Sequence, residues 1–195
     1  MKVSVRFIFV AVLVLAQVSG SQTKSSSNSA SVAGMERKLQ HVQQNAASAT
    51  PNRAPTEFGE QEINDYFAAG KVKLPAGVQS VTFQGQPEVV TGTARVDFDQ
   101  IVAGRQSSNP LLGMFRGVHD VVVVAHAHGV GGQGFVNVDS VSLDGMEVPR
   151  FLLQVFVDKY LHPKYPAIGL DSQFALPDRV DTATVGLHKL TITQR

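Results

Sequence analysis

The sequence predicts an α+β domain in which one curved antiparallel sheet lies around or against a hydrophobic helix. Three observations carry this prediction. Residues 90–99 alternate apolar and polar side chains, as a half-buried strand does. Short turns join this segment to other alternating segments, and short turns connect antiparallel strands. Residues 149–161 are apolar on nearly every helical face, so we expect that helix to be buried on most sides.

Length and composition narrow the class of protein. The chain has 195 residues, which suits one domain, with 43% apolar and 17% charged residues. These values exclude a disordered chain and a multispanning membrane protein. The absence of cysteine excludes disulfide scaffolds, zinc knuckles, iron–sulfur sites and cysteine nucleophiles. Without Lys2 and Arg6 the chain holds 15 basic and 16 acidic residues, so nothing in its charge favours nucleic-acid binding.

The N-terminus has the pattern of a secretory signal peptide. Two positive charges, Lys2 and Arg6, precede ten apolar residues at 7–16, a run too short to span a bilayer, which needs about 20. Val18 and Gly20 have side chains small enough for signal peptidase, so we expect cleavage after Gly20. An uncleaved N-terminal anchor is the alternative. The mature protein is therefore expected to be exported, either to the periplasm or as a secreted protein.

Beyond the signal peptide at residues 1–20, the chain is expected to comprise a linker and one domain. Residues 21–34 are serine-rich without a periodic apolar pattern, which predicts a flexible linker. Residues 35–195 are predicted to form the α+β domain. Its first element is a weakly amphipathic helix over 35–48.

A second helix is predicted over residues 60–69. Gly59 is its expected N-cap, and Glu62 stands at the third helical position, where a capping box places a glutamate. Three apolar side chains at helical spacing form one stripe: Ile63, Tyr66 and Phe67.

The remaining chain is predicted to be mainly strand. Alternation and turn residues indicate strands at 78–83, 90–99, 118–128 and 135–143, and more strand toward the C-terminus. The apolar parity of the last segment changes near His188, for which we expect a β-bulge.

Two apparent motifs have simple structural interpretations. Residues 129–134 satisfy G-x-G-x-x-G, but a strand pattern follows instead of the helix that would hold a pyrophosphate, so we expect a hairpin turn. Asp97 and Asp99 lie on the polar face of an alternating segment and are expected to be solvated.

His126 and His128 project from one face of a strand, as in the H-x-H metal motif of cupins. The glutamate that a cupin requires shortly afterwards is missing, and His119 or Glu147 would replace it only by an accident of the fold. We therefore expect both histidines to face solvent and to bind no metal, with a cupin-like metalloenzyme as an alternative. The chain also lacks G-x-S-x-G and H-E-x-x-H, so we expect neither catalysis nor a cofactor.

An apolar loop at residues 109–117 has two interpretations. It either plugs the core as a short turn, or forms a mobile flap or membrane-touching tip at the mouth of a pocket. In the second case Arg116 is available for a lipid phosphate. The proposed mouth residues are Leu111, Leu112, Met114, Phe115 and Arg116.

Four short segments, in this order and spacing, resemble exported bacterial lipid-binding proteins of the YceB-like and LmeA-like kind, within the wider TULIP-like group. They are FGEQEINDYF at 58–67, LPxGV at 74–78, GxAxVDF at 92–98 and VxLDGxxVP at 141–149. The resemblance covers residues 57–161, with Gly59 where the family usually has Ser or Thr. It implies a strongly curved antiparallel sheet wrapped around a hydrophobic helix, with an apolar cavity that holds acyl chains.

The helix at 149–161 supports the same function on physical grounds. One curved sheet covers only part of an all-round apolar helix, and an acyl chain can cover the rest at about 0.8 kcal/mol per methylene. The expected cavity wall is Phe151, Leu152, Val155 and Phe156. We therefore predict a non-enzymatic protein whose partner is a lipid or another apolar ligand, with transient membrane contact. A ligand-free structural component of the cell envelope is the alternative.

Overall fold

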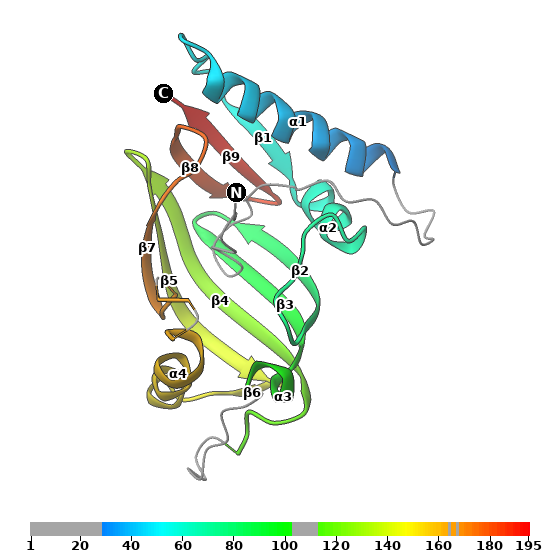
Figure 1. The fold of residues 1–195 in the computed structure, drawn as a ribbon, viewed down its shortest axis with the longest axis vertical. Helices are drawn as coiled ribbons and strands as arrows, with labels where there is room; N and C mark the ends of the chain where they lie inside the picture. Colours follow the sequence, from blue (N-terminus) through cyan, green and yellow to red (C-terminus); the bar gives the residue numbers. More distant parts are fainter. Residues whose placement is uncertain (1–28, 103–112, 164, 167) are drawn as a thin grey trace.

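The computed structural model describes residues 29–102, 113–163, 165–166 and 168–195 (Figure 1). The predicted signal peptide, part of the predicted linker, and Leu111 and Leu112 lie outside these residues. The helical elements are α1 (Ser29–Ala47), α2 (Glu60–Ala68), α3 (Phe98–Ile101), α4 (Arg150–Phe156) and η2 (Val157–Leu161), the last a π-helix that continues α4. The strands are β1 (Thr56–Gly59), β2 (Val78–Gln86), β3 (Val89–Asp97), β4 (Val118–Val130), β5 (Gln133–Leu143), β6 (Met146–Glu147), β7 (Asp171–Ala175), β8 (Val180–Gly186) and β9 (Lys189–Gln194).

The nine strands form one open antiparallel sheet, which confirms the predicted α+β class. The main path runs β1-β9-β8-β4-β3-β2, and β5 pairs with β4, β6 and β7. The long β4 pairs with β3 along most of its length and with β8 near its end, at His128 and Gly129. Figure 1 shows α1 lying across the β1–β9 part of the sheet and α4 beside its opposite end.

Tight turns account for the hairpins. Gly131 and Gly132 occupy the β4–β5 turn with φ of 60° and 78°, so the G-x-G-x-x-G segment is a hairpin turn, as predicted. Asp144 and Gly145 do the same between β5 and β6, with φ of 49° and 82°. Two consecutive residues with positive φ suit the twist of antiparallel strands.

The glutamate half of the capping box predicted for α2 is present, whereas Gly59 has no side chain to supply the other half. The backbone N–H of Gly59 donates to Glu62 Oε2 at 2.8 Å. Lys38 of α1 reaches the same oxygen at 2.6 Å, so this carboxylate also joins the two N-terminal helices. The negative charge lies in the first turn of α2, where the helix dipole stabilises it.

Two expected element boundaries and one expected bulge were wrong. Helix α1 begins at Ser29, so the end of the predicted linker, residues 29–34, is helical. Strand β3 ends at Asp97, whose side chain accepts a hydrogen bond from the backbone N–H of Asp99 and caps α3. The parity change near His188 is a hairpin turn between β8 and β9, in which His188 has φ of 54°, and not a bulge.

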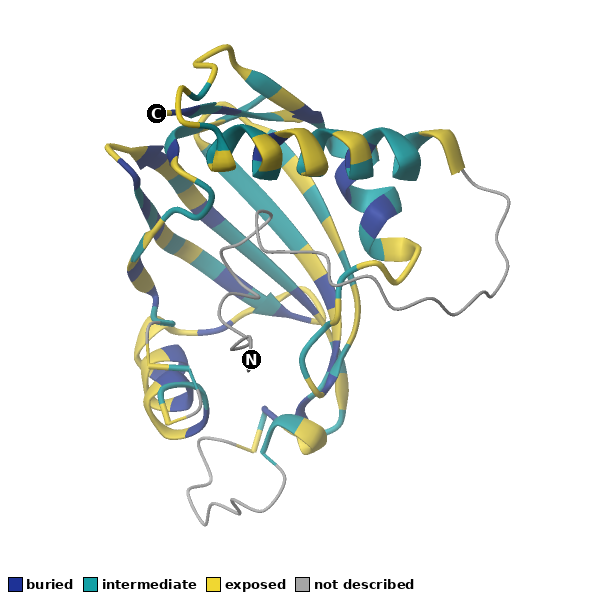
Figure 2. Cartoon of the chain, turned by 45° about the horizontal axis from the view of Figure 1, so that its top comes forward, coloured by how far each residue is buried: buried dark blue, intermediate teal, exposed yellow. Residues whose placement is uncertain are grey.

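Two separate groups of buried side chains stabilise the molecule. One joins the ends of β3, β4 and β5 to α4 and η2. The other joins α1 and α2 to β1, β8 and β9. Figure 2 shows how the strands between them alternate in burial along their length. None of the helices described is long and apolar enough to cross a membrane.

Candidate functional site

The apolar side chains of the sheet's long strands share one face. In β3 they are Val90, Gly92, Ala94 and Val96, as the alternation predicts, and all four line a cavity. Antiparallel register sets Gly92 opposite Phe83 of β2 on one side and Val123 of β4 on the other. A bulge at residue 139 keeps the apolar side chains of β5 on this face, because Ala125 faces Val138 while Val124 faces Ser140.

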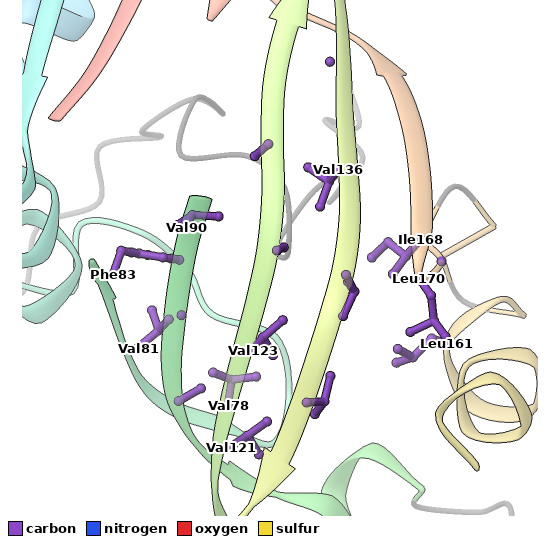
Figure 3. A pocket seen from close by; sticks show the side chains of 18 of the residues that line it. Val78, Val81, Phe83, Val90, Val121, Val123, Val136, Leu161, Ile168 and Leu170 are labelled. Carbon is purple, nitrogen blue, oxygen red and sulfur yellow. The ribbon is translucent and has the colours of Figure 1, made fainter. Parts of the chain in front are cut away.

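This face is covered at both ends and open between them. Ala94, Val96 and Val121 are buried in the group around α4. Farther along the strands, Val81, Phe83, Val90 and Val123 are only half-buried. A cavity of about 320 Å³ occupies this region. Figure 3 shows the side chains of these four strand residues pointing into the cavity, with Leu161, Ile168 and Leu170 on the opposite side.

The lining is almost entirely apolar. Three polar residues border it: Glu60, His128 and Lys189. Glu60 Oε2 accepts a hydrogen bond from the backbone N–H of Gly85 at 2.8 Å and lies 3.0 Å from His188 Nδ1. Burial is the largest single influence on the pKa of Glu60 and raises it. The hydrogen bonds from Gly85 and His188 together outweigh burial, so the pKa of Glu60 is lower than its ordinary value. The charged lining side chains thus lie where α2 and the β8–β9 turn meet the end of β2.

The opposite end is closed by aromatic rings. Phe115 packs on Phe156 of α4 with ring centroids 4.4 Å apart, and Phe98 lies 5.6 Å from Phe115 and 5.5 Å from Phe156. Tyr160 of η2 adds a contact with Phe156 at 5.2 Å. Phe98, Phe115 and Phe156 all line the cavity and are called the aromatic floor below.

The predicted wall helix contributes only one face to the cavity. Phe156 lines it at 6% exposure, and Leu152 is buried in the adjoining group. Phe151 is 62% exposed and Val155 36%, so the expectation that the helix is buried on most sides was wrong. The residues that sequence reasoning missed are Leu153, Val157 and Leu161. Their spacing from Phe156 is helical. A polar signal could have found this stripe, because Gln154, Asp158 and Lys159 are all exposed and lie on the opposite side of the helix.

Of the predicted mouth residues, Phe115 belongs to the floor. It is 3% exposed, and Met114 packs against the same buried group. The side chain of Arg116 is exposed, while its backbone carbonyl contacts His119. The burial of Phe115 supports the interpretation of this segment as a core plug, whereas Leu111 and Leu112 lie outside the described residues.

The predicted outward orientation of His126 and His128 is confirmed. Both are exposed; His126 Nδ1 lies 2.8 Å from Asp139 Oδ2, and the ring of His128 stacks on Phe135 with centroids 5.1 Å apart. His119 lies elsewhere, paired with Asp144. Across the described part of the chain, no three His, Asp or Glu side chains gather as metal ligands would.

His119 ties the segment that carries Phe115 to the sheet. Its Nδ1 lies 2.6 Å from Asp144 Oδ2, and its Nε2 lies 2.6 Å from the carbonyl oxygen of Arg116. Because a carbonyl and an ionised carboxylate only accept, both ring nitrogens carry protons in this geometry. The hydrogen bond to Asp144, and then that to Arg116, raise the pKa of His119 above its ordinary value of 6.5.

The chemistry available to this cavity is the binding of an apolar molecule. Its middle lacks charged side chains, and the charged groups at one end already have protein partners. No family model, curated protein or solved structure matches the chain. The resemblance to exported lipid-binding proteins therefore stays a prediction, and the cavity is the feature of the molecule that bears on function.

Proposed function

We propose that this protein binds the hydrocarbon chain of a lipid in the cavity, without catalysis. The observation that carries the proposal is an apolar lining of half-buried strand residues between two buried groups. Apolar surface left in contact with water is costly, and each methylene that replaces water contributes about 0.8 kcal/mol. A chain therefore gains affinity along its length without a specific polar contact.

The dimensions suit a single chain. A volume of about 320 Å³ lies at the lower limit of ligand pockets, which span roughly 300–1,000 Å³. The lining follows β2 from Val78 to Gly85, which is roughly 23 Å at about 3.3 Å per residue. Half of a bilayer's hydrocarbon core, the depth of one acyl chain, is roughly 15 Å. One extended chain fits these limits better than two.

The proposal includes the geometry implied by the family resemblance and an exported location. In it, the sheet curves strongly around the helix formed by α4 and η2, and the lipid chain covers the inner stripe of that helix. Export is supported by the pattern of the first 20 residues, in which two positive charges precede a short apolar run. A carrier of lipid chains is useful in a compartment where lipids must cross water between membranes.

The test is a variant that fills the cavity without disturbing the fold. A Cβ at Gly92 would meet only the ring of Phe83, at 3.8 Å, and the backbone there is ordinary strand. Gly92→Ile places a branched side chain in the cavity at a position where strands favour one. Thr93→Ile is the matched control, because Thr93 is the next residue of β3 and is exposed on the other face.

We expect Gly92→Ile to weaken binding of a fluorescent fatty acid at least tenfold, while Thr93→Ile binds as the wild type does. Solvent extraction and mass spectrometry of the purified wild-type protein should also yield lipid. A wild-type protein that neither carries lipid nor binds the probe favours the alternative, a structural component of the cell envelope without a ligand.

A further inference from the structure

The two ends of the cavity differ in chemistry. The charged lining residues Glu60 and Lys189 lie near the β8–β9 turn, where Lys189 Nζ contacts Glu57 Oε1 at 2.8 Å. Both side chains of that ion pair are about half exposed, so water reaches this end. The aromatic floor at the other end presents only carbon to the cavity.

This asymmetry fixes how an amphiphile can enter. A polar head placed against Phe98, Phe115 and Phe156 would lose its hydrogen bonds to water without replacing them, which costs several kilocalories per mole. At the other end the same head meets water and charged side chains. The hydrocarbon tail has no such restriction and gains from burial.

We infer that the cavity binds single-chain amphiphiles with the polar head near Glu60 and Lys189 and the chain terminus against the aromatic floor, which sets the longest chain accepted. This inference rests on the proposed function and adds the ligand's orientation and a chain-length limit. The floor is suited to the second role because its rings are closely packed, with Phe115 only 3% exposed, so it does not yield to an extra methylene.

The chain-length limit is tested with saturated fatty acids of increasing length. Affinity for the wild-type protein should rise about fourfold per methylene and then stop rising at one length. Phe115→Ala deepens the cavity and should move this limit to longer chains. Phe115→Leu, a smaller change, should move it in the same direction if the alanine variant does not fold.

A second variant should move the limit in the opposite direction. Ala94 lies on the inner face of β3, within the buried group that contains the aromatic floor. Ala94→Leu raises the floor and should reduce affinity for the longest accepted chains at least tenfold while leaving shorter chains unaffected. Thr93→Leu, on the outer face of the same strand, is the control and should leave the whole series unchanged.

Orientation is tested separately with spin-labelled fatty acids. A label near the carboxylate should broaden the amide NMR signals of Gly85 and Val185, and a label near the methyl end should broaden those of Phe115 and Phe156. The reverse pattern, or a limit that none of the inner-face variants moves, overturns the inference while leaving lipid binding intact. A protein that binds no chain of any length contradicts the proposed function itself.

Discussion

Asn64 of α2 and Phe83 of β2 exchange two hydrogen bonds at the edge of the sheet. Asn64 Nδ2 donates to the carbonyl of Phe83 at 2.8 Å, and the N–H of Phe83 donates to Asn64 Oδ1 at 2.7 Å. One helical turn away, Glu60 accepts the N–H of Gly85. The side-chain amide thus replaces the peptide group of a further strand, and α2 covers an edge that would otherwise be open to pairing with another chain.

Asn64→Ala should therefore destabilise the protein by about 1–3 kcal/mol, because it leaves a half-buried N–H and carbonyl without their partner. Asn64→Asp should retain the acceptor for Phe83 N–H but lose the donor to its carbonyl. Urea unfolding measures both. Gln61→Ala is the control, because Gln61 is exposed and its Nε2 donates to Asp65 Oδ1 of the same helix at 2.8 Å. Equal stability of the Asn64→Ala and Gln61→Ala variants would contradict this account.

Two inner-face glycines should respond oppositely to alanine. A Cβ at Gly134 would clash with the ring of Phe174, whereas a Cβ at Gly92 has room. Gly134→Ala should cost roughly 1–3 kcal/mol through overpacking, and Gly92→Ala should be neutral or stabilising by up to about 1 kcal/mol. Thermal melts of the two variants decide the point, and adding Phe174→Leu to Gly134→Ala should restore part of the loss.

Two phenylalanines of one helix should differ in their effect on stability. Phe156 is buried in the aromatic floor and Phe151 is 62% exposed. Phe156→Ala should cost about 3–5 kcal/mol, whereas Phe151→Ala should stay within about 0.5 kcal/mol of the wild type. Denaturant unfolding measures both, and a comparable cost at Phe151 would show that this face is covered in solution.

The contacts of His119 predict a pH dependence of stability. Its folded pKa is raised above 6.5, so its contribution is fully present below pH 6.5 and is lost as pH rises through the folded pKa. The pKa of Asp144 is lowered from 3.8, chiefly by the hydrogen bond to His119, so its contribution is lost as pH falls below that value. The pair therefore stabilises the fold most between these two values.

Melting temperatures across this pH range should show the dependence in the wild type and not in His119→Gln. Nearby charges belong to Arg116 and to Arg95 and Asp120, which pair with each other at 2.9 Å. His126→Gln is the matched control, since His126 also contacts an aspartate but lies on the outer face. If the pH dependence is lost in His126→Gln instead, it arises from His126 and not from His119.

Intact-mass measurement tests the predicted export. When the full chain is expressed in a bacterial host that can export it, the exported protein should begin at Ser21, because the small residues Val18 and Gly20 suit signal peptidase. A full-length mass in a membrane fraction would instead support an uncleaved anchor.

Local sequence patterns determined most of the secondary structure. The alternation of residues 90–97 fixed both the strand β3 and its inner face, and the glycine pair at 131 and 132 fixed a hairpin. Glu62 marks the start of α2 by accepting a hydrogen bond from the backbone N–H of Gly59. Each of these signals depends on interactions within a few residues, so the sequence alone is enough to predict it.

Only the tertiary structure decided which apolar side chains form the site. Residues 150–161 carry large apolar side chains on both sides of the helix, although Gln154 and Asp158 mark one side as polar. The packing of Phe156 against Phe98 and Phe115 buries the other side, while Phe151 stays in water. The parity change near His188 fitted a bulge as well as a hairpin until β9 paired with both β8 and β1. The cavity arises because the two buried groups pack at opposite ends of one sheet face and leave its middle uncovered. Each group joins segments far apart in the chain, so no local sequence pattern predicts the uncovered region between them.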